Sequence, residues 1–171
     1  YLSITSIDDL NHVHTEQIQN IPASAFVNPG PIEVYFDVTH DRNGEDTITT
    51  IGGVILGISP KPICFRQNDM CPESPNYIHT RMVGFLFIMR MINEDLTTLF
   101  NRDTHLFLPD ASTTKSVTGK QRRNLDPSTK NIQQMAMNQV TICDQRTSHE
   151  LVVKTANTKY AWFMEARKLA K

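Results

Sequence analysis

The segment from Pro31 to Pro60 constrains the fold of this chain more than any other stretch. Its centre is Asn43-Gly44, the dipeptide that most readily gives both central residues of a tight turn the positive φ of a type I′ turn. Strand-forming residues flank this dipeptide on both sides. The sequence therefore predicts a long β-hairpin, on which the rest of the sheet is built.

The alternation of residues in the hairpin predicts its faces. With Asn43 and Gly44 as the loop residues, Phe36 faces Ile51 and Val38 faces Thr49. The first strand then has a buried face and a half-exposed face. The residues of the buried face are Ile32, Val34, Phe36 and Val38, and those of the other face are Glu33, Tyr35, Asp37 and Thr39. The same register opposes Asp41 and Asp46, and this like-charge pair favours a longer loop.

One long helix is predicted after the hairpin. Ser74 suits an N-cap and Pro75 the first helical position, and apolar residues then recur at steps of three and four as far as Leu99. Between Met82 and Ile92 the segment is apolar nearly all round, so we expect it to be buried on more than one side.

The remaining segments complete an α+β prediction. We expect a mostly antiparallel sheet built on the long β-hairpin, with one long buried helix and a C-terminal helix, in a single globular domain over residues 1–171. The smaller elements expected are a helix at Ser6–Ile18, strands at Ile63–Arg66 and Thr104–Leu108, a helix at Asn131–Asn138, strands at Val140–Asp144 and Glu150–Lys154, and a helix at Thr158–Lys171.

Residues 111–130 contain almost nothing apolar, several Ser and Thr residues, and both Gly119 and Pro127. This composition predicts a mobile basic loop, and long loops are commonly functional or disordered. We expect its cations to contact nucleic acid or an anionic membrane. These cations are Lys115, Lys120, Arg122, Arg123 and Lys130. If the loop has no such role, the contact falls to the later cations, which are Lys154, Lys159, Arg167 and Lys168.

Charge is distributed unevenly along the chain. Residues 1–110 hold six Lys and Arg against fourteen Asp and Glu, whereas residues 111–171 hold eleven against four. Such asymmetry is typical of proteins that bind nucleic acid or anionic lipid, or whose copies attract one another through complementary surfaces. Mixing of both halves into one neutral surface is the alternative. Three cysteines at irregular spacing do not form a disulfide framework, which favours a reducing, intracellular compartment such as cytoplasm or nucleus.

The chain contains no phosphate-binding loop, no dinucleotide fingerprint, no GxSxG elbow and no HExxH motif. The acidic strand Tyr35–Asp41, followed by an apolar strand, looks like the first hairpin of RNase H-like and PIWI-type nucleases. In that family a strand aspartate binds catalytic magnesium, and Asp110 stands where a second carboxylate would be supplied. The resemblance implies two Mg²⁺ ions held by converging carboxylates. Its candidate catalytic residues are Asp37, Asp41, Asp110 and Glu150.

The sequence-based hypothesis is a non-enzymatic structural protein that self-associates as a homo-oligomer and contacts RNA or anionic lipid. A viral matrix- or capsid-type protein of the virion would have this character, and the abundant Thr and Asn fit that class. No cofactor, metal or small-molecule substrate is inferred. One alternative is the RNase H-like nuclease, in which Asp37 and Asp110 would hold Mg²⁺, although we expect these two residues to lie apart. The other is an intracellular protein-interaction domain.

Overall fold

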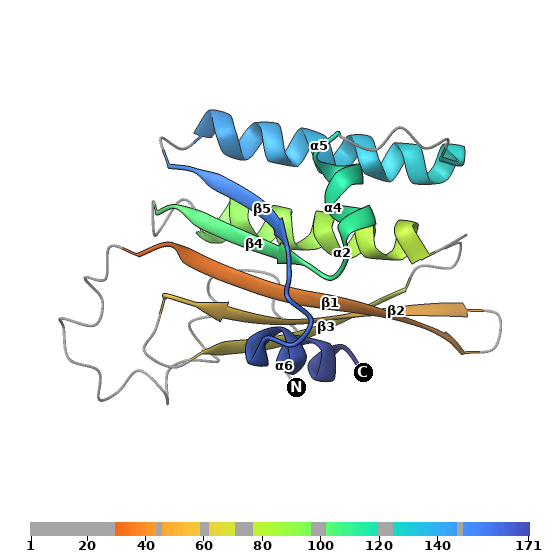
Figure 1. Cartoon of the computed structure of the whole chain (residues 1–171). Helices are drawn as coiled ribbons and strands as arrows, with labels where there is room; N and C mark the ends of the chain where they lie inside the picture. The colour runs from red at the N-terminus through yellow and green to blue at the C-terminus, as the bar shows by residue number, and fades with distance from the viewer. Residues whose placement is uncertain are drawn as a thin grey trace.

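A five-stranded mixed sheet with helices on both faces forms the framework of the computed structural model (Figure 1). The structure describes residues 30–43, 46–58, 62–70, 77–96, 102–119, 125–146 and 149–171. Its elements, in chain order, are β1 (Ile32–Asn43), β2 (Asp46–Leu56), β3 (Ile63–Met70), α2 (Tyr77–Met91) with the π-helical turn η2 (Ile92–Leu96), β4 (Thr104–Leu108), α4 (Ala111–Val117), α5 (Pro127–Arg146), β5 (Leu151–Thr155) and α6 (Ala161–Ala170).

The strand order across the sheet is β3-β2-β1-β4-β5. Strands β1, β2 and β3 pair antiparallel, whereas β4 is parallel to β1, and β5 is parallel to β4. The α+β class is therefore confirmed, but the prediction of a mostly antiparallel sheet is wrong. The crossover from β3 through α2 to β4 returns the chain in the direction of β1, and this makes the second half of the sheet parallel.

The hairpin forms with a register that differs from the predicted one by two residues. Val38 pairs with Ile51 and Phe36 with Gly53, while Asn43 pairs with Asp46. Asp41 consequently lies opposite Ile48, and the predicted like-charge pair does not form. Because side chains alternate with a period of two, a shift of two residues leaves every side chain on its predicted face. The predicted buried residues of β1 are indeed buried.

The middle of the second face of β1 is buried as well, whereas Glu33 and Thr39 at its two ends are partly exposed, so the prediction of a half-exposed face holds only at these ends. Helix α6 packs across β1 and β2 on this face (Figure 1). The exposed fraction of Tyr35 is 4%, and its ring stacks on that of Phe107 with 4.5 Å between centroids. Asp37 is likewise only 5% exposed. Sequence alternation alone did not indicate that a helix from the end of the chain covers this face.

Helices α2 and α5 lie on the opposite side of the sheet from α6 (Figure 1). Helix α2 confirms the predicted long helix, and Met82, Phe85 and Met89 are fully buried in it. It lies between the sheet and α5, which explains why its sequence is apolar nearly all round. The predicted strand Val140–Asp144 is wrong, because these residues belong to the 20-residue helix α5.

The predicted loop over residues 111–130 is only partly a loop, and the predicted N-terminal helix cannot be compared with the structure. Helix α4 occupies residues 111–117 and α5 begins at Pro127, so the prediction of a loop over all of 111–130 is wrong at both ends. Residues 120–124 and the predicted N-terminal helix Ser6–Ile18 lie outside the described residues. Among the helices that the structure describes, none has both the length and the apolar character needed to cross a membrane.

Candidate functional site

Asp37 lies in β1 on the face covered by α6. Its Oδ2 accepts a hydrogen bond from Arg167 Nε at 2.9 Å, and its Oδ1 accepts one from the backbone N–H of Val38 at 2.8 Å. Only 7% of the Asp37 side chain is exposed, against 39% for Arg167. Arg167 also lies over the Phe163 ring, 4.7 Å from its centroid, so the guanidinium is oriented by two contacts.

Asp110 lies just beyond β4, where it caps helix α4. Its Oδ1 accepts the backbone N–H of Thr113 at 2.6 Å, and its Oδ2 accepts the Thr113 hydroxyl at 3.0 Å. Oδ2 also forms an ion pair with Arg81 from the first turns of α2. The carboxylate thus satisfies a donor of the helix N-terminus and neutralises an arginine of the neighbouring helix.

The two aspartates lie level with the carboxyl end of β4, and this end of the strands is the edge of the sheet that they share. Strands β1 and β4 run parallel with Tyr35 opposite Phe107. Continued by two residues, this register places Asp37 level with Pro109, next to Asp110, on strands that lie about 4.8 Å apart. Asp37 faces α6, whereas Asp110 bonds to α2 on the other side of the sheet. The backbones of the two residues are therefore neighbours on adjacent strands, whereas their carboxylates face opposite sides of the sheet.

The other predicted acids do not join this edge. Asp41 is exposed and lies four residues further along β1, which is about 13 Å at the usual rise per strand residue. Glu150 precedes β5, and β5 runs parallel to β4. Glu150 therefore lies at the opposite edge of the sheet, where its backbone N–H donates to Asp103 Oδ1 at 2.8 Å.

A magnesium site of the type implied by the nuclease resemblance needs several converging carboxylates with free lone pairs. In this structure both oxygens of Asp37 and both oxygens of Asp110 already accept hydrogen bonds, and each carboxylate is paired with an arginine. No group of three or more His, Cys, Asp or Glu residues suited to a metal ion occurs within the described ranges. The donor set that is present does not fit two magnesium ions.

The predicted basic contact residues are only partly described. Lys115 is exposed in the last turn of α4, and Lys130 is exposed in the first turns of α5. Lys120, Arg122 and Arg123 lie outside the described residues. The structure therefore places two of the five predicted cations on helices rather than on a loop.

A basic end of α6 is better defined. It consists of Arg66, Arg167, Lys168 and Lys171. Arg66 donates from Nε to the carbonyl of Leu169 at 3.0 Å, which brings β3 to the last turn of the helix. Lys168 and Lys171 are exposed beside it. Cations suit the negative end of the helix dipole. Arg66 was not predicted as part of any site, because its chain position gives no sign of this contact.

The polar groups between β1, α2 and α5 form a separate buried cluster. His79 is 4% exposed, and its Nδ1 lies 3.4 Å from the Thr129 hydroxyl. Burial lowers the pKa of His79, and the nearby His40 lowers it further, whereas Asp126 opposes the shift. His79 is therefore neutral at physiological pH, as expected for a structural core histidine.

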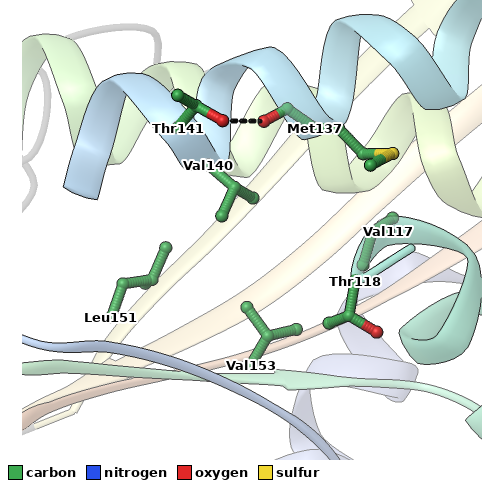
Figure 2. A pocket seen from close by; sticks show the side chains of 7 residues that line it. All are labelled: Val117, Thr118, Met137, Val140, Thr141, Leu151 and Val153. Carbon is green, nitrogen blue, oxygen red and sulfur yellow. Dashed lines mark hydrogen bonds between the residues drawn. The ribbon is translucent and has the colours of Figure 1, made fainter. Parts of the chain in front are cut away.

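A pocket of about 280 Å³ lies between α4, α5 and β5. Figure 2 shows Val140, Leu151 and Val153 on its walls, together with the Thr141 hydroxyl, which donates to the Met137 carbonyl. Its lining residues are apolar except for two threonines. Because none of the described residues that line it is an acid, a base or a thiol, this pocket offers no catalytic group.

Neither a protein-family model nor a curated protein matches this sequence. Solved structures do match its fold. RNase H1 of the halophilic archaeon Halobacterium salinarum NRC-1 is 18% identical with a TM-score of 0.56, over 82% of this chain and 94% of that one. The N-terminal RNase H domain of a Mycobacterium tuberculosis protein is 9% identical with a TM-score of 0.54, over 80% and 95%.

A third match is LC11-RNase H1, isolated from compost, which is 15% identical with a TM-score of 0.52, over 81% of this chain and 91% of that one. The prediction of a viral matrix- or capsid-type assembly protein is wrong on these findings, which favour the RNase H-like alternative. At these identities the likeness establishes architecture rather than activity. The chain has an RNase H-like fold.

Proposed function

We propose that this chain is a nucleic-acid-directed domain of the RNase H-like type, and that it binds a nucleic-acid duplex beside the edge of the sheet that carries Asp37 and Asp110. The observation that carries the proposal is the basic end of α6, which lies next to Asp37 in a fold shared with RNases H1. The proposal replaces self-assembly with nucleic-acid recognition.

The chemistry of the basic end suits phosphate. Arg167 uses Nε for Asp37, and its side chain remains 39% exposed, so the guanidinium can also face an incoming anion. Lys168 and Lys171 are exposed and add point charges on the same turn of helix. Cations grouped in this way bind the phosphate backbone of nucleic acid, with an affinity that falls as salt rises.

The proposal is tested by fluorescence anisotropy with labelled RNA/DNA hybrid, double-stranded DNA and double-stranded RNA of one sequence. We expect a Lys168→Ala/Lys171→Ala variant to bind more weakly. The slope of log affinity against log salt should also fall by about 0.9 for each phosphate that the variant no longer neutralises. The matched control is Lys154→Ala/Lys159→Ala, which removes two exposed charges that precede α6. Equal binding by wild type and both variants would contradict the proposed surface.

Metal-dependent cleavage is a second candidate function, which the fold shared with RNases H1 favours. It requires that both arginines leave their carboxylates. The discriminating assay incubates each duplex with the protein and Mg²⁺ or Mn²⁺, alongside Asp37→Asn and Asp110→Asn. Cleavage by the wild type that is absent from both variants would establish the nuclease, whereas intact duplex in every lane would leave binding as the function.

A further inference from the structure

We infer that Arg81 and Arg167 are built-in counter-charges that take the place of divalent metal ions at this edge of the sheet, so that the domain binds nucleic acid without Mg²⁺. The inference deepens the proposed function and rests on it for the identity of the ligand. Its metal part depends only on the two acid–arginine pairs.

The first pair leaves Asp37 no room for a hydrated ion. Its side chain is 7% exposed, one oxygen accepts from Val38 N–H, and the other accepts from Arg167 Nε. Mg²⁺ binds in octahedral geometry and usually keeps several of its waters. Binding it here would require displacement of a guanidinium that is held both by the carboxylate and by the face of Phe163.

The second pair also leaves no carboxylate oxygen available to a metal ion, because Asp110 has a structural role. Asp110 accepts from Thr113 at the start of α4 while it is paired with Arg81 of α2. It therefore joins two helices to the end of β4. Transfer of this carboxylate to a metal would remove the cap of α4 as well as the partner of Arg81.

The charges of the two pairs already balance. Each aspartate contributes one negative charge, and each arginine contributes one positive charge at any physiological pH. A divalent cation brought to either aspartate would meet the guanidinium group that is paired with it, while the other two predicted acids, Asp41 and Glu150, lie elsewhere. Repulsion from like charges in a partly buried setting opposes metal binding.

The same arrangement suits a metal-free contact with phosphate. In a metal site, cations bridge protein carboxylates and phosphate oxygens. Here Arg167 is both the partner of Asp37 and a partly exposed cation next to Lys168 and Lys171, so it can bridge Asp37 and a phosphate without an ion.

The first experiment titrates the wild type with Mg²⁺ and Mn²⁺, by calorimetry and by thermal denaturation. We expect no saturable heat and no saturable rise in Tm. Saturable binding that is abolished by both Asp37→Asn and Asp110→Asn would overturn the inference. This measurement decides the question even if every arginine variant fails to fold.

The second experiment exchanges the counter-charges for acids. An Arg81→Glu/Arg167→Asp variant carries two carboxylates on each face of the sheet, one pair beside Asp37 and one beside Asp110. We expect it to gain saturable Mn²⁺ binding and a higher Tm in the presence of Mn²⁺. The matched control, Arg81→Gln/Arg167→Gln, removes the same charges without adding acids and should gain neither. If the folded acid variant binds no more Mn²⁺ than wild type, the arginines are not what excludes the metal, and the inference is wrong.

A third measurement compares duplex binding in EDTA with binding in Mg²⁺ at one ionic strength. Equal Kd values support the inference, whereas a Kd at least tenfold lower in Mg²⁺ contradicts it. If no duplex binds under either condition and the metal titrations are also negative, the proposed function and the nucleic-acid part of the inference are wrong. The part that concerns metal exclusion by the two arginines is then still supported.

Discussion

Asp37 and Arg167 lie 130 residues apart in the chain, yet they form an ion pair of 2.9 Å that joins the middle of strand β1 to α6. Removal of the arginine leaves a buried carboxylate with one backbone donor. We therefore expect Arg167→Met to lower the free energy of unfolding by about 1–3 kcal/mol. Urea denaturation monitored by circular dichroism measures this decrease.

The double variant Asp37→Asn/Arg167→Met supplies the control for that pair. Because the neutral amide removes the unpaired charge, we expect the double variant to be more stable than the sum of the two single effects predicts. Strict additivity would mean that the ion pair contributes nothing to stability.

Asp110 makes a separate contribution to stability as the N-cap of α4. We expect Asp110→Ala to cost about 1–2 kcal/mol, because the N–H of Thr113 loses its acceptor. Asp110→Asn keeps an acceptor oxygen and should cost less. Thermal and urea denaturation of both variants check the order, and equal destabilisation would show that the cap is not the source of the effect.

The close approach of α6 to β2 depends on Gly52. A Cβ atom at this position would lie 2.5 Å from the carbonyl oxygen of Ala166 and 2.6 Å from the carbonyl carbon of Leu169, both of which are backbone atoms. We expect Gly52→Ala to cost about 3 kcal/mol or more, since the helix must move away. Trp162, the single tryptophan, lies in α6 and reports this movement through its fluorescence.

Phe36 tests the opposite face of the sheet. It is fully buried beneath α2, so we expect Phe36→Ala to cost about 3–5 kcal/mol. Unlike Gly52→Ala, this change should leave the fluorescence of Trp162 in the folded state unaltered. A shift of equal size in both variants would mean that the two faces do not respond independently.

His79 predicts a dependence of stability on pH. Burial lowers its pKa in the folded protein below the ordinary value of 6.5. The unfolded chain therefore takes up a proton first as the pH falls through 6.5, and stability decreases until the folded pKa is passed. We expect the urea concentration at the unfolding midpoint to decrease as the pH is lowered from 7.5 to 5.5, and to decrease less in His79→Gln. An unchanged slope in that variant would contradict the assignment.

Local patterns predicted the elements that are periodic over many residues. The first strand, helix α2 and strand β4 were found because their apolar residues recur at the spacing of one structure. Helix α5 was misread at Val140–Asp144, where β-branched residues favour a strand. The residues Ile132, Ala136, Val140 and Cys143 nonetheless recur at helical steps, and this longer pattern determines the structure.

The candidate site could be predicted only in part. Asp37 and Asp110 were identified because each is an acidic residue within or just after an apolar strand, a position that can be recognised in the sequence. Their arginine partners were not identified as partners, since Arg81 comes 29 residues before Asp110 and Arg167 comes 130 residues after Asp37. Such pairs depend on how α2 and α6 pack on the two faces of the sheet, and no local sequence pattern records that packing.

Duplex binding in EDTA tests the account most directly, because it requires an RNase H-like surface that contacts nucleic acid without a metal ion. The measurement is the anisotropy of a labelled duplex titrated with the wild type and with the Lys168→Ala/Lys171→Ala variant at several salt concentrations. We predict saturable binding by the wild type that weakens with salt, and a variant with lower affinity and a shallower salt dependence. Absence of wild-type binding in EDTA, with binding restored by Mg²⁺, would contradict the account.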